Sequence, residues 1–147
     1  MTPLLNKTSK YKKYFKKSIK NIKFNNLRYG LIGIRLLESC RLTPKQLESI
    51  RRVFVRLTKR AGKFWICVFL NQAITKKSKG SRMGKGVGAL DSWTIDVKAG
   101  QVVLEFTLSD IALLDDFNAG IKGKIPCKWD FVIREFDFII ENDTKRN

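Results

Sequence analysis

Alternating apolar positions predict β-strands at several places, covering residues 30–37, 63–70, 92–97, 101–108 and 128–140. In the first of these, Ile32, Ile34 and Leu36 fall on one side. The second is apolar on both sides, which is typical of a central, covered strand. The third and fourth are close enough in sequence to form a hairpin around residues 98–100. The strands predict an antiparallel sheet.

A helix is predicted after the first strand. Thr43 is suited to the N-cap, Pro44 to the first helical position, and Gln46 can close a capping box. Gly62 is a fitting stop. Apolar residues recur at helical spacing and form one stripe, made of Leu47, Ile50, Phe54, Leu57 and Ala61. This stripe predicts a helix with one face packed on the sheet.

A second helix is predicted from Ser109, its N-cap, to about Asn118. Asp110 is suited to the positive end of that helix dipole. The length of 147 residues fits one domain. Together these elements predict an α+β fold, with an antiparallel sheet and two helices packed on it.

Charge is divided unevenly along the chain. Residues 1–90 contain 23 Lys and Arg against two acids, Glu38 and Glu48, a balance of +21. Residues 91–147 contain 7 basic and 11 acidic residues, a balance of −4, which brings the whole chain to +17. Like charges at this density repel one another unless a polyanion is nearby. A phosphate backbone is the simplest partner, because each neutralised phosphate releases counterions.

Other residue types exclude several classes of protein. Histidine is absent, which removes the usual general base and the commonest zinc ligand. Cys40, Cys67 and Cys127 are far apart and odd in number, so neither a disulfide framework nor a structural zinc site is expected. No apolar run is long enough for a membrane span. We expect no catalytic residue, no metal and no cofactor.

Residues 1–29 form a basic arm in which Lys is interleaved with aromatic residues. Without a partner, its like charges and lack of a core predict disorder. Three interpretations are an organelle targeting peptide, a membrane-surface helix and a tail that binds RNA. The rarity of Arg counts against the first, and the narrow apolar face counts against the second. The RNA-binding tail is preferred.

The first helix also carries a basic face. Opposite its apolar stripe it gathers Lys45, Arg52, Arg56, Lys59, Arg60 and Lys63. A merely solvated face would gain more from mixed charges, because Glu and Lys one turn apart stabilise a helix. Only Glu48 interrupts the basic residues, and it lies at the edge. Phosphate contact is therefore the preferred interpretation of this face.

A glycine-rich loop is predicted at residues 73–90, and it contains RMGKGVG at residues 82–88. Its backbone N–H groups and basic side chains can hold phosphates. A P-loop does not match, because too few residues separate Gly80 from Gly84 and Lys85 is followed by Gly. The G-x-G-x-G spacing also differs from the dinucleotide-binding fingerprint. RNA binding is preferred over a solvated linker.

Several motifs occur in order along the chain: RLTPKQLE at residues 41–48, RR at 51–52, GKFWI at 62–66, ITKK at 74–77 and RMGKG at 82–86. In combination they resemble the family of bacterial-type large-subunit ribosomal protein sixteen, over roughly residues 8–132. Four features depart from the family pattern. Cys40 stands where Gly is usual, and residues 105–108 lack the Gly common after that strand. Val87 stands where the family commonly has Lys, and residues 133–147, acidic and apolar, extend past the usual end.

The resemblance implies a structural, non-catalytic protein of the large ribosomal subunit with a hammerhead-like α+β fold. It implies binding to large-subunit rRNA near the peptidyl-transferase centre and the aminoacyl-tRNA site. Residues 1–29 are then a basic rRNA-binding tail and residues 30–132 an α+β rRNA-binding domain. Residues 133–147 are an extension that can meet neighbouring ribosomal proteins. The alternative is a free RNA-binding protein or RNA chaperone.

The residues expected to contact rRNA are Lys10, Lys12, Lys13, Lys16, Lys17, Arg28, Arg41, Arg51, Arg52, Arg56, Lys59, Arg60, Lys63, Lys76 and Lys77. The loop residues expected nearest the peptidyl-transferase centre and tRNA are Arg82, Met83, Gly84, Lys85 and Gly86. Lys outnumbers Arg two to one, and this bias favours a mitochondrial ribosome in the matrix over a bacterial cytoplasm. Neither membrane association nor a homo-oligomer is expected.

Overall fold

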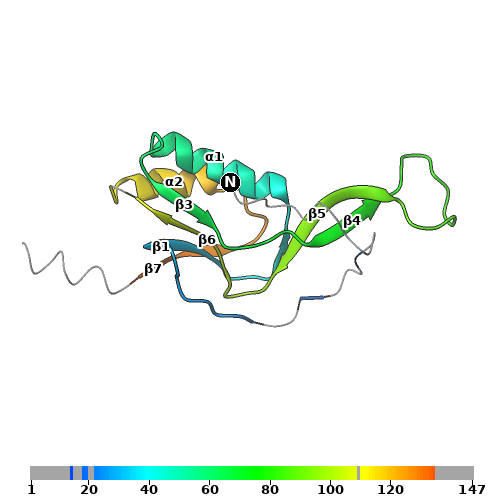
Figure 1. The fold of residues 1–147 in the computed structure, drawn as a ribbon, viewed down its shortest axis with the longest axis horizontal. Helices are drawn as coiled ribbons and strands as arrows, with labels where there is room; N and C mark the ends of the chain where they lie inside the picture. Colours follow the sequence, from blue (N-terminus) through cyan, green and yellow to red (C-terminus); the bar gives the residue numbers. More distant parts are fainter. Residues whose placement is uncertain (1–13, 15–17, 20–21, 109, 135–147) are drawn as a thin grey trace, which may run out of the picture.

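The computed structural model describes residue 14 and residues 18–19, 22–108 and 110–134 (Figure 1). Over these residues the chain forms two helices and seven strands. The neighbouring strands within each sheet are antiparallel. The α+β fold expected from the sequence is confirmed. The strands form two sheets, however, instead of the one sheet that the sequence suggested.

A four-stranded sheet lies at the centre of the fold, in the order β3-β6-β1-β7. Its strands are β3 (Lys63–Ile66), β6 (Val102–Thr107), β1 (Ile32–Leu36) and β7 (Trp129–Ile133). Ile32, Ile34 and Leu36 are buried, as their alternation predicts. Residues 102–106 of β6 are all buried, which makes β6 a covered interior strand.

The prediction of a central strand at residues 63–70 is wrong. β3 ends at Ile66 and lies at the edge of the sheet, beside β6. Both faces of β3 are apolar because side chains from other segments cover them. The ring of Phe64 packs on Phe54 of the first helix, with centroids 5.1 Å apart. On the other face, Trp65 stacks on Tyr29 at 6.3 Å, so distant segments cover an edge strand on both sides.

The second sheet has three strands, with β5 (Ala89–Val97) between β2 (Cys40–Leu42) and β4 (Gln72–Lys76). The hairpin predicted around residues 98–100 is therefore wrong, because β5 and β6 belong to different sheets. Gly100 makes the turn between them with a φ of 81°, and its N–H donates to the Leu36 carbonyl at 2.7 Å. β5 pairs instead with β4, so both ends of the predicted loop 73–90 are strand.

The first helix, α1 (Pro44–Leu57), begins where the sequence predicts. The Oε1 atom of Gln46 accepts the backbone N–H of Thr43 at 2.9 Å and completes the capping box. Leu47, Ile50 and Phe54 are buried. The predicted apolar stripe therefore faces the core over most of its length.

The end of α1 differs from the prediction. The helix stops at Leu57, and Lys59 and Arg60 then adopt left-handed φ values of 48° and 72°. Ala61, the last member of the predicted stripe, is exposed. Gly62 serves close packing, because a Cβ there would lie 2.8 Å from the ring of Phe54. The glycine marks a contact with the core instead of the helix stop.

The second helix, α2 (Leu113–Ile121), starts later than predicted. Ser109, the expected N-cap, lies outside the described residues. Ala112 occupies the N-cap position, and its backbone N–H donates to Asp110 Oδ1 at 3.0 Å. The Asp110 carboxylate thus accepts a backbone N–H at the N-terminus of α2. This position is close to the predicted one at the positive end of the helix dipole.

An aromatic cluster joins both helices to the sheet. Phe54 of α1, Phe106 of β6 and Phe117 of α2 are at most 1% exposed. Their ring centroids lie 5.0–5.5 Å apart. Both helices lie on one face of the four-stranded sheet (Figure 1). Each buried aromatic side chain stabilises such a core by roughly 1.5–3 kcal/mol, which gives the basic face of α1 a firm support.

Residues 22–30 lie on the opposite face of the same sheet (Figure 1). Leu27 packs over Gly33 so closely that a Cβ on Gly33 would overlap its side chain. Gly33 alternates with Ile32 and Ile34, so it faces away from the helices. The carboxylate of Glu105 also holds this segment through three backbone N–H groups. Most of the basic arm before residue 22 lies outside the described residues.

The three cysteines are free thiols. The Sγ atoms of Cys127 and Cys40 lie 3.0 Å apart, although 87 residues separate them in the sequence. Among the described residues, no group of three or more side chains is arranged to hold a metal ion. The same residues contain no helix with the length and apolar surface that crossing a bilayer requires.

Candidate nucleic-acid interface

The outer face of α1 holds a basic hollow, which we call the α1 groove. Lys45, Arg52 and Arg56 are exposed there, because the buried residues of the helix face the opposite way. Lys124, from the connection between α2 and β7, joins them. The hollow measures about 520 Å³ and is lined by Pro44, Lys45, Glu48, Ser49, Arg52, Val53, Arg56 and Lys124. Four cations therefore surround one site.

A close approach of the two helices explains how Lys124 reaches α1. Gly120, near the end of α2, lies against Val53, and a Cβ at that position would lie 2.6 Å from Val53 Cγ1. The missing side chain lets the helices pack closely. The chain then leaves α2 beside the outer face of α1, where Lys124 lines the groove.

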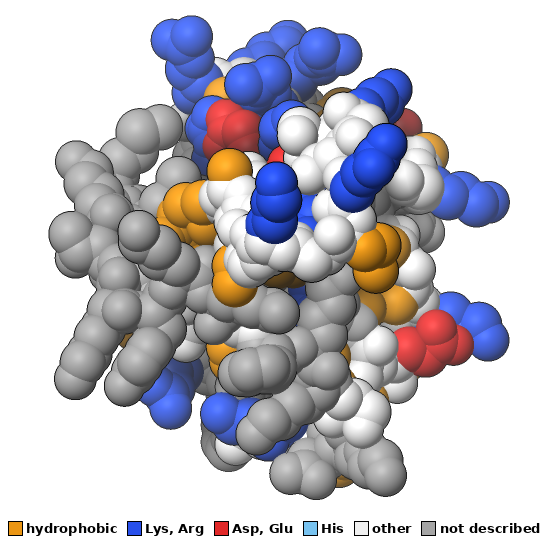
Figure 2. Space-filling model, turned by 90° about the vertical axis from the view of Figure 1, so that its right-hand side faces the viewer, with side chains coloured by type: hydrophobic (Ala, Val, Ile, Leu, Met, Phe, Trp, Pro, Cys, Tyr) orange, Lys and Arg blue, Asp and Glu red, His pale blue; other side chains and the backbone are white. Residues whose placement is uncertain are grey.

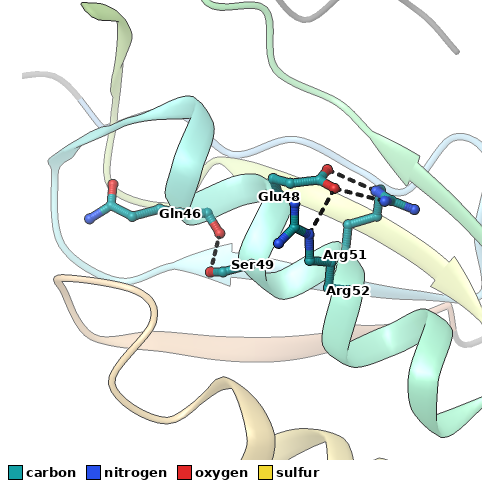
Figure 3. Close-up of polar contacts among 5 residues, drawn as sticks. All are labelled: Gln46, Glu48, Ser49, Arg51 and Arg52. Carbon is teal, nitrogen blue, oxygen red and sulfur yellow. Dashed lines mark hydrogen bonds and ion pairs between the residues drawn. The ribbon is translucent and has the colours of Figure 1, made fainter.

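Glu48 is the one acid in the α1 groove, and two arginines neutralise it (Figure 3). Arg51 donates two hydrogen bonds to its carboxylate, at 2.8 and 2.7 Å, and Arg52 donates one at 3.3 Å. The hydrogen bonds from Arg51 are the main reason that the pKa of Glu48 falls to about 2. Arg52 remains 74% exposed, so its guanidinium is still open to a ligand.

Arg41 is engaged elsewhere. Its guanidinium pairs with Asp96 between β2 and β5, where the two residues lie opposite each other in the strand register. The hydrogen bond to Asp96 raises the pKa of Arg41. Both side chains are largely buried, so this pair joins the strands of the second sheet.

More cations follow the end of α1. Lys59 and Arg60 are exposed in their left-handed turn, and Lys63 is exposed at the start of β3. Lys76 is exposed at the end of β4. These residues extend the basic surface of the chain, but none of them lines the α1 groove.

The glycine-rich loop, residues 77–88, connects β4 to β5 and projects beyond the rest of the described chain (Figure 1). Arg82, Met83 and Lys85 are exposed, and Met83 reaches 95% exposure. An apolar side chain that contacts water this fully is available to a partner. The loop therefore presents two cations and a methionine at the end of a long hairpin.

Backbone geometry gives the loop its shape. Gly80, Gly84 and Gly86 have φ values of 82–88°, and Lys85 between the last two has a φ of 54°. Glycine adopts such left-handed φ values without a steric penalty, so the chain turns tightly here. Lys77 donates its Nζ hydrogen bond to the Gly84 carbonyl, so this cation stabilises the loop itself.

Figure 2 looks onto the end of the molecule that bears the loop. Lys and Arg side chains project around this face, and the acidic side chains visible on it adjoin basic ones. The ion pairs of the described residues include Glu48 with Arg51, and Glu38 with Lys128 at 3.4 Å. The described surface on this side is therefore predominantly positive.

Residues 6–132 match the model of the ribosomal protein L16p/L10e family. The chain belongs to this family. The resemblance carried by the sequence motifs is thereby confirmed. L16p/L10e proteins are structural rather than enzymatic, so this chain is a structural protein of the large ribosomal subunit. As a family member it is located at the ribosome and associates with rRNA and ribosomal proteins.

Within this L16p/L10e chain, three sets of the predicted basic residues lie apart from one another or outside the described residues. Lys45 was expected on the basic helix face, and the structure brings it together with Arg52 and Arg56 in the α1 groove. The loop residues 82–86 lie apart, on the hairpin. Five lysines of the arm lie outside the described residues: Lys10, Lys12, Lys13, Lys16 and Lys17. Their role stays a prediction.

One cation was missed as a candidate contact, and another was predicted only as part of the basic arm. Lys124 lines the α1 groove, and Lys23 lines a separate cleft on the other side of the sheet. The position of Lys124 beside α1 depends on the packing of α2 against α1, which local sequence signals do not reveal. The cleft beside Lys23 could not be predicted, because it forms only after β3 and β6 pair.

Proposed function

We propose that this L16p/L10e protein binds large-subunit rRNA through the α1 groove and the glycine-rich loop. The observation that supports it most is the convergence of Lys45, Arg52, Arg56 and Lys124 on one hollow. Four cations around 520 Å³ repel one another until phosphates neutralise them. The guanidinium groups of Arg52 and Arg56 can each donate two parallel hydrogen bonds to one phosphate. Such bidentate contacts also fix the orientation of the phosphate.

The remaining predicted contacts extend this surface. Arg51 acts through its ion pair with Glu48, while Lys59, Arg60, Lys63 and Lys76 are exposed outside the α1 groove. Arg28 is exposed on the opposite side of the sheet. The lysines of the arm supply further phosphate contacts. Arg41 and Lys77 act indirectly, since Asp96 and the Gly84 carbonyl engage their side chains.

The loop is proposed to lie near the peptidyl-transferase centre and the aminoacyl-site tRNA. This part of the proposal comes from the motif RMGKG and its family resemblance. Exposure of Arg82 and Lys85 at the end of a projecting hairpin supports it. Replacing either by Ala should leave the fold intact while impairing subunit maturation or tRNA accommodation. Normal translation by both variants would remove this assignment.

The organelle and the partner proteins belong to the same proposal. Lys outnumbers Arg two to one, a bias consistent with a gene of an AT-rich mitochondrial genome. Residues 133–147 combine acidic and apolar residues, which suits a neighbouring protein better than RNA. Fractionation of organelles, followed by detection of the chain in matrix ribosomes, tests the location. Recovery from a bacterial cytoplasm would contradict it.

Sedimentation separates a stable ribosomal protein from a free RNA-binding protein or chaperone. The full chain should move with large subunits at low salt and remain with them at high salt, because the RNA encloses many of its contacts. A transient binder would be released as salt screens its phosphate contacts. Release at moderate salt with normal subunits would therefore favour the free RNA-binding protein.

A further inference from the structure

A second hollow lies on the face of the four-stranded sheet opposite the helices, between residues 23–29 and the strands β3 and β6. It measures about 450 Å³, within the roughly 300–1,000 Å³ of small-molecule sites. We call it the Glu105 cleft. The residues that matter for its chemistry are Lys23, Arg28, Tyr29, Cys67, Phe69 and Glu105.

Glu105 lies in the wall of this cleft and is only 2% exposed. Its Oε2 accepts the backbone N–H groups of Arg28, Tyr29 and Gly30 at 3.0, 2.6 and 2.9 Å. Burial alone would raise the pKa of Glu105, but the hydrogen bonds from this backbone and from Cys67 outweigh burial and lower it. The side chain is therefore an anion at neutral pH.

The other oxygen of this carboxylate has a weaker partner. Oε1 accepts from the Cys67 thiol at 3.3 Å, and no other donor to it is found among the described residues. Burial raises the pKa of Cys67 to about 12, so the thiol keeps its proton and remains a weak donor. A buried carboxylate oxygen gains most from a stronger N–H donor, so Oε1 retains capacity for a ligand.

The walls of the cleft suit a planar ring. Tyr29 is 60% exposed and Phe69 is 49% exposed, and both line it. Trp65, with its ring 6.3 Å from Tyr29 and inclined by 25°, supports the tyrosine from the sheet. RNA-binding proteins stack unpaired bases on exposed aromatic rings of this kind.

The rim of the cleft selects against a cation. Lys23 and Arg28 are exposed there, so a lysine or arginine side chain from another protein would be repelled. A phosphate would be attracted to the same two side chains. The cleft thus combines cations at the rim, aromatic rings in the walls and a buried hydrogen-bond acceptor.

We propose that the Glu105 cleft binds one unstacked RNA nucleotide, with its phosphate at Lys23 and Arg28 and a base N–H donated to Glu105 Oε1. Guanine fits best, because N1–H and N2–H are adjacent donors on its Watson–Crick edge, so one of them can donate to Oε1 with no base acceptor facing the carboxylate, whereas the N4–H donor of cytosine adjoins the N3 acceptor. The inference rests on the proposed rRNA-binding function and deepens it. It adds a base-reading site to a surface that otherwise contacts phosphates.

The test is a titration of the ¹⁵N-labelled full chain with 5′-GMP, 5′-CMP and inorganic phosphate, followed by amide NMR shifts at constant ionic strength. GMP should move amides of residues 66–69 and 101–102 and bind about tenfold more tightly than CMP. Phosphate alone, which has no base to enter the cleft, should not reproduce these shifts at the same concentration. Equal affinity for GMP and CMP, or GMP shifts confined to the loop and the α1 groove, would overturn the proposal.

Two aromatic variants separate stacking from general charge effects. Phe69→Ala should weaken GMP binding by about tenfold, since it removes a stacking ring. Phe24→Ala is the matched control, because Phe24 is 76% exposed and does not line the cleft. Its GMP affinity should equal that of the unmodified chain. Unchanged affinity in Phe69→Ala would contradict the site.

Glu105→Gln tests the acceptor and keeps the volume of the side chain. It should abolish the preference for GMP over CMP, provided that the shifts of residues 28–30 show the segment still in place. A preference that survives in a folded Glu105→Gln variant would contradict the role of Oε1. If Glu105→Gln does not fold, the comparison of Phe69→Ala with Phe24→Ala tests the nucleotide site instead.

Binding to large-subunit rRNA, measured on the same preparations, distinguishes the two proposals. If the unmodified chain binds rRNA but GMP does not occupy the cleft, only the nucleotide site fails. If the chain does not bind rRNA, the proposed function fails, and GMP binding would then stand as a property of the cleft alone.

Discussion

The four-stranded sheet with its helices and the β4–β5 hairpin with its loop use the same residue types for different purposes. In the sheet, Phe106 and Leu104 are fully buried, and glycine allows close packing. In the loop, Met83 is almost fully exposed, and a Cβ on Gly80, Gly84 or Gly86 would meet nothing within 4 Å. Burial therefore sets the stability of the protein in the first region, whereas the second is free to fit a partner.

The charged residues divide in the same way. The most buried carboxylate among the described residues, that of Glu105, accepts backbone N–H groups and holds a segment in place. The loop cations Arg82 and Lys85 are exposed, and within the described residues neither forms an ion pair with an acid. Internal charges of this protein stabilise its fold, and surface charges remain available for phosphate.

Phe54→Ala should have the largest effect on stability. Phe54 packs on Phe64, Phe106 and Phe117, and truncation of such a core aromatic costs about 3–5 kcal/mol. Urea unfolding of the full chain measures the change. Met83→Ala is the control and should change the free energy of unfolding by less than about 0.5 kcal/mol. Equal losses in both variants would erase the distinction between the two regions.

Glu105→Gln should have the next largest effect, because hydrogen bonds to a charged group contribute about 1.5–3 kcal/mol. The folded pKa of Glu105 is lowered, so its stabilisation is present above the ordinary value of 4.5 and is lost as pH falls through the folded pKa. Urea unfolding at pH 7 and pH 3.5 should show the chain losing stability in acid.

The acid sensitivity should be smaller in Glu105→Gln than in the unmodified chain. Glu48→Gln is the comparison, because the pKa of Glu48 is also lowered, to about 2. Its side chain is about one-third exposed, and solvent screens its ion pairs, so its effect should be the lesser. A Glu105→Gln variant as acid-sensitive as the unmodified chain would show that this carboxylate does not stabilise the fold through its charge.

The same substitution, Gly to Ala, can be made in the four-stranded sheet region and in the loop, and the two effects on stability can then be compared. Gly62→Ala should cost about 1–3 kcal/mol, because the new methyl would press on the Phe54 ring and the Thr107 carbonyl oxygen at 2.8 Å. Gly80→Ala meets only the penalty of its φ of 82°, at most about 1–2 kcal/mol, and the loop can relax. Thermal unfolding should rank the variants in that order, and the reverse order would contradict the packing around Gly62.

Much of the fold could be predicted from local signals. The start of α1 follows from Thr43, Pro44 and Gln46, whose caps and fixed φ act within a few residues. The buried alternation of β1 was likewise readable. The basic face of α1 was predicted for the same reason, since helical periodicity alone turns Arg52 and Arg56 outward.

The predictions from the sequence were wrong where contacts between distant segments determine the structure. Strand β3 was placed at the centre of the sheet, although Phe64 and Trp65 are covered by a helix and by Tyr29. β5 and β6 were paired because they are neighbours in sequence, but β4 takes the edge of β5. Lys124 and the Glu105 cleft were missed for the same reason, because each depends on contacts between elements that sequence spacing does not reveal.

The most direct test of the central claim is the salt dependence of large-subunit rRNA binding, with the full chain compared to a variant in which Lys45, Arg52, Arg56 and Lys124 are all Ala. Lys122→Ala, an exposed lysine outside the groove, is the control. With four phosphate contacts removed, the slope of log affinity against log salt should fall by about three, while thermal unfolding stays close to that of the unmodified chain. An unchanged slope in a folded variant would contradict the assignment of the α1 groove to rRNA.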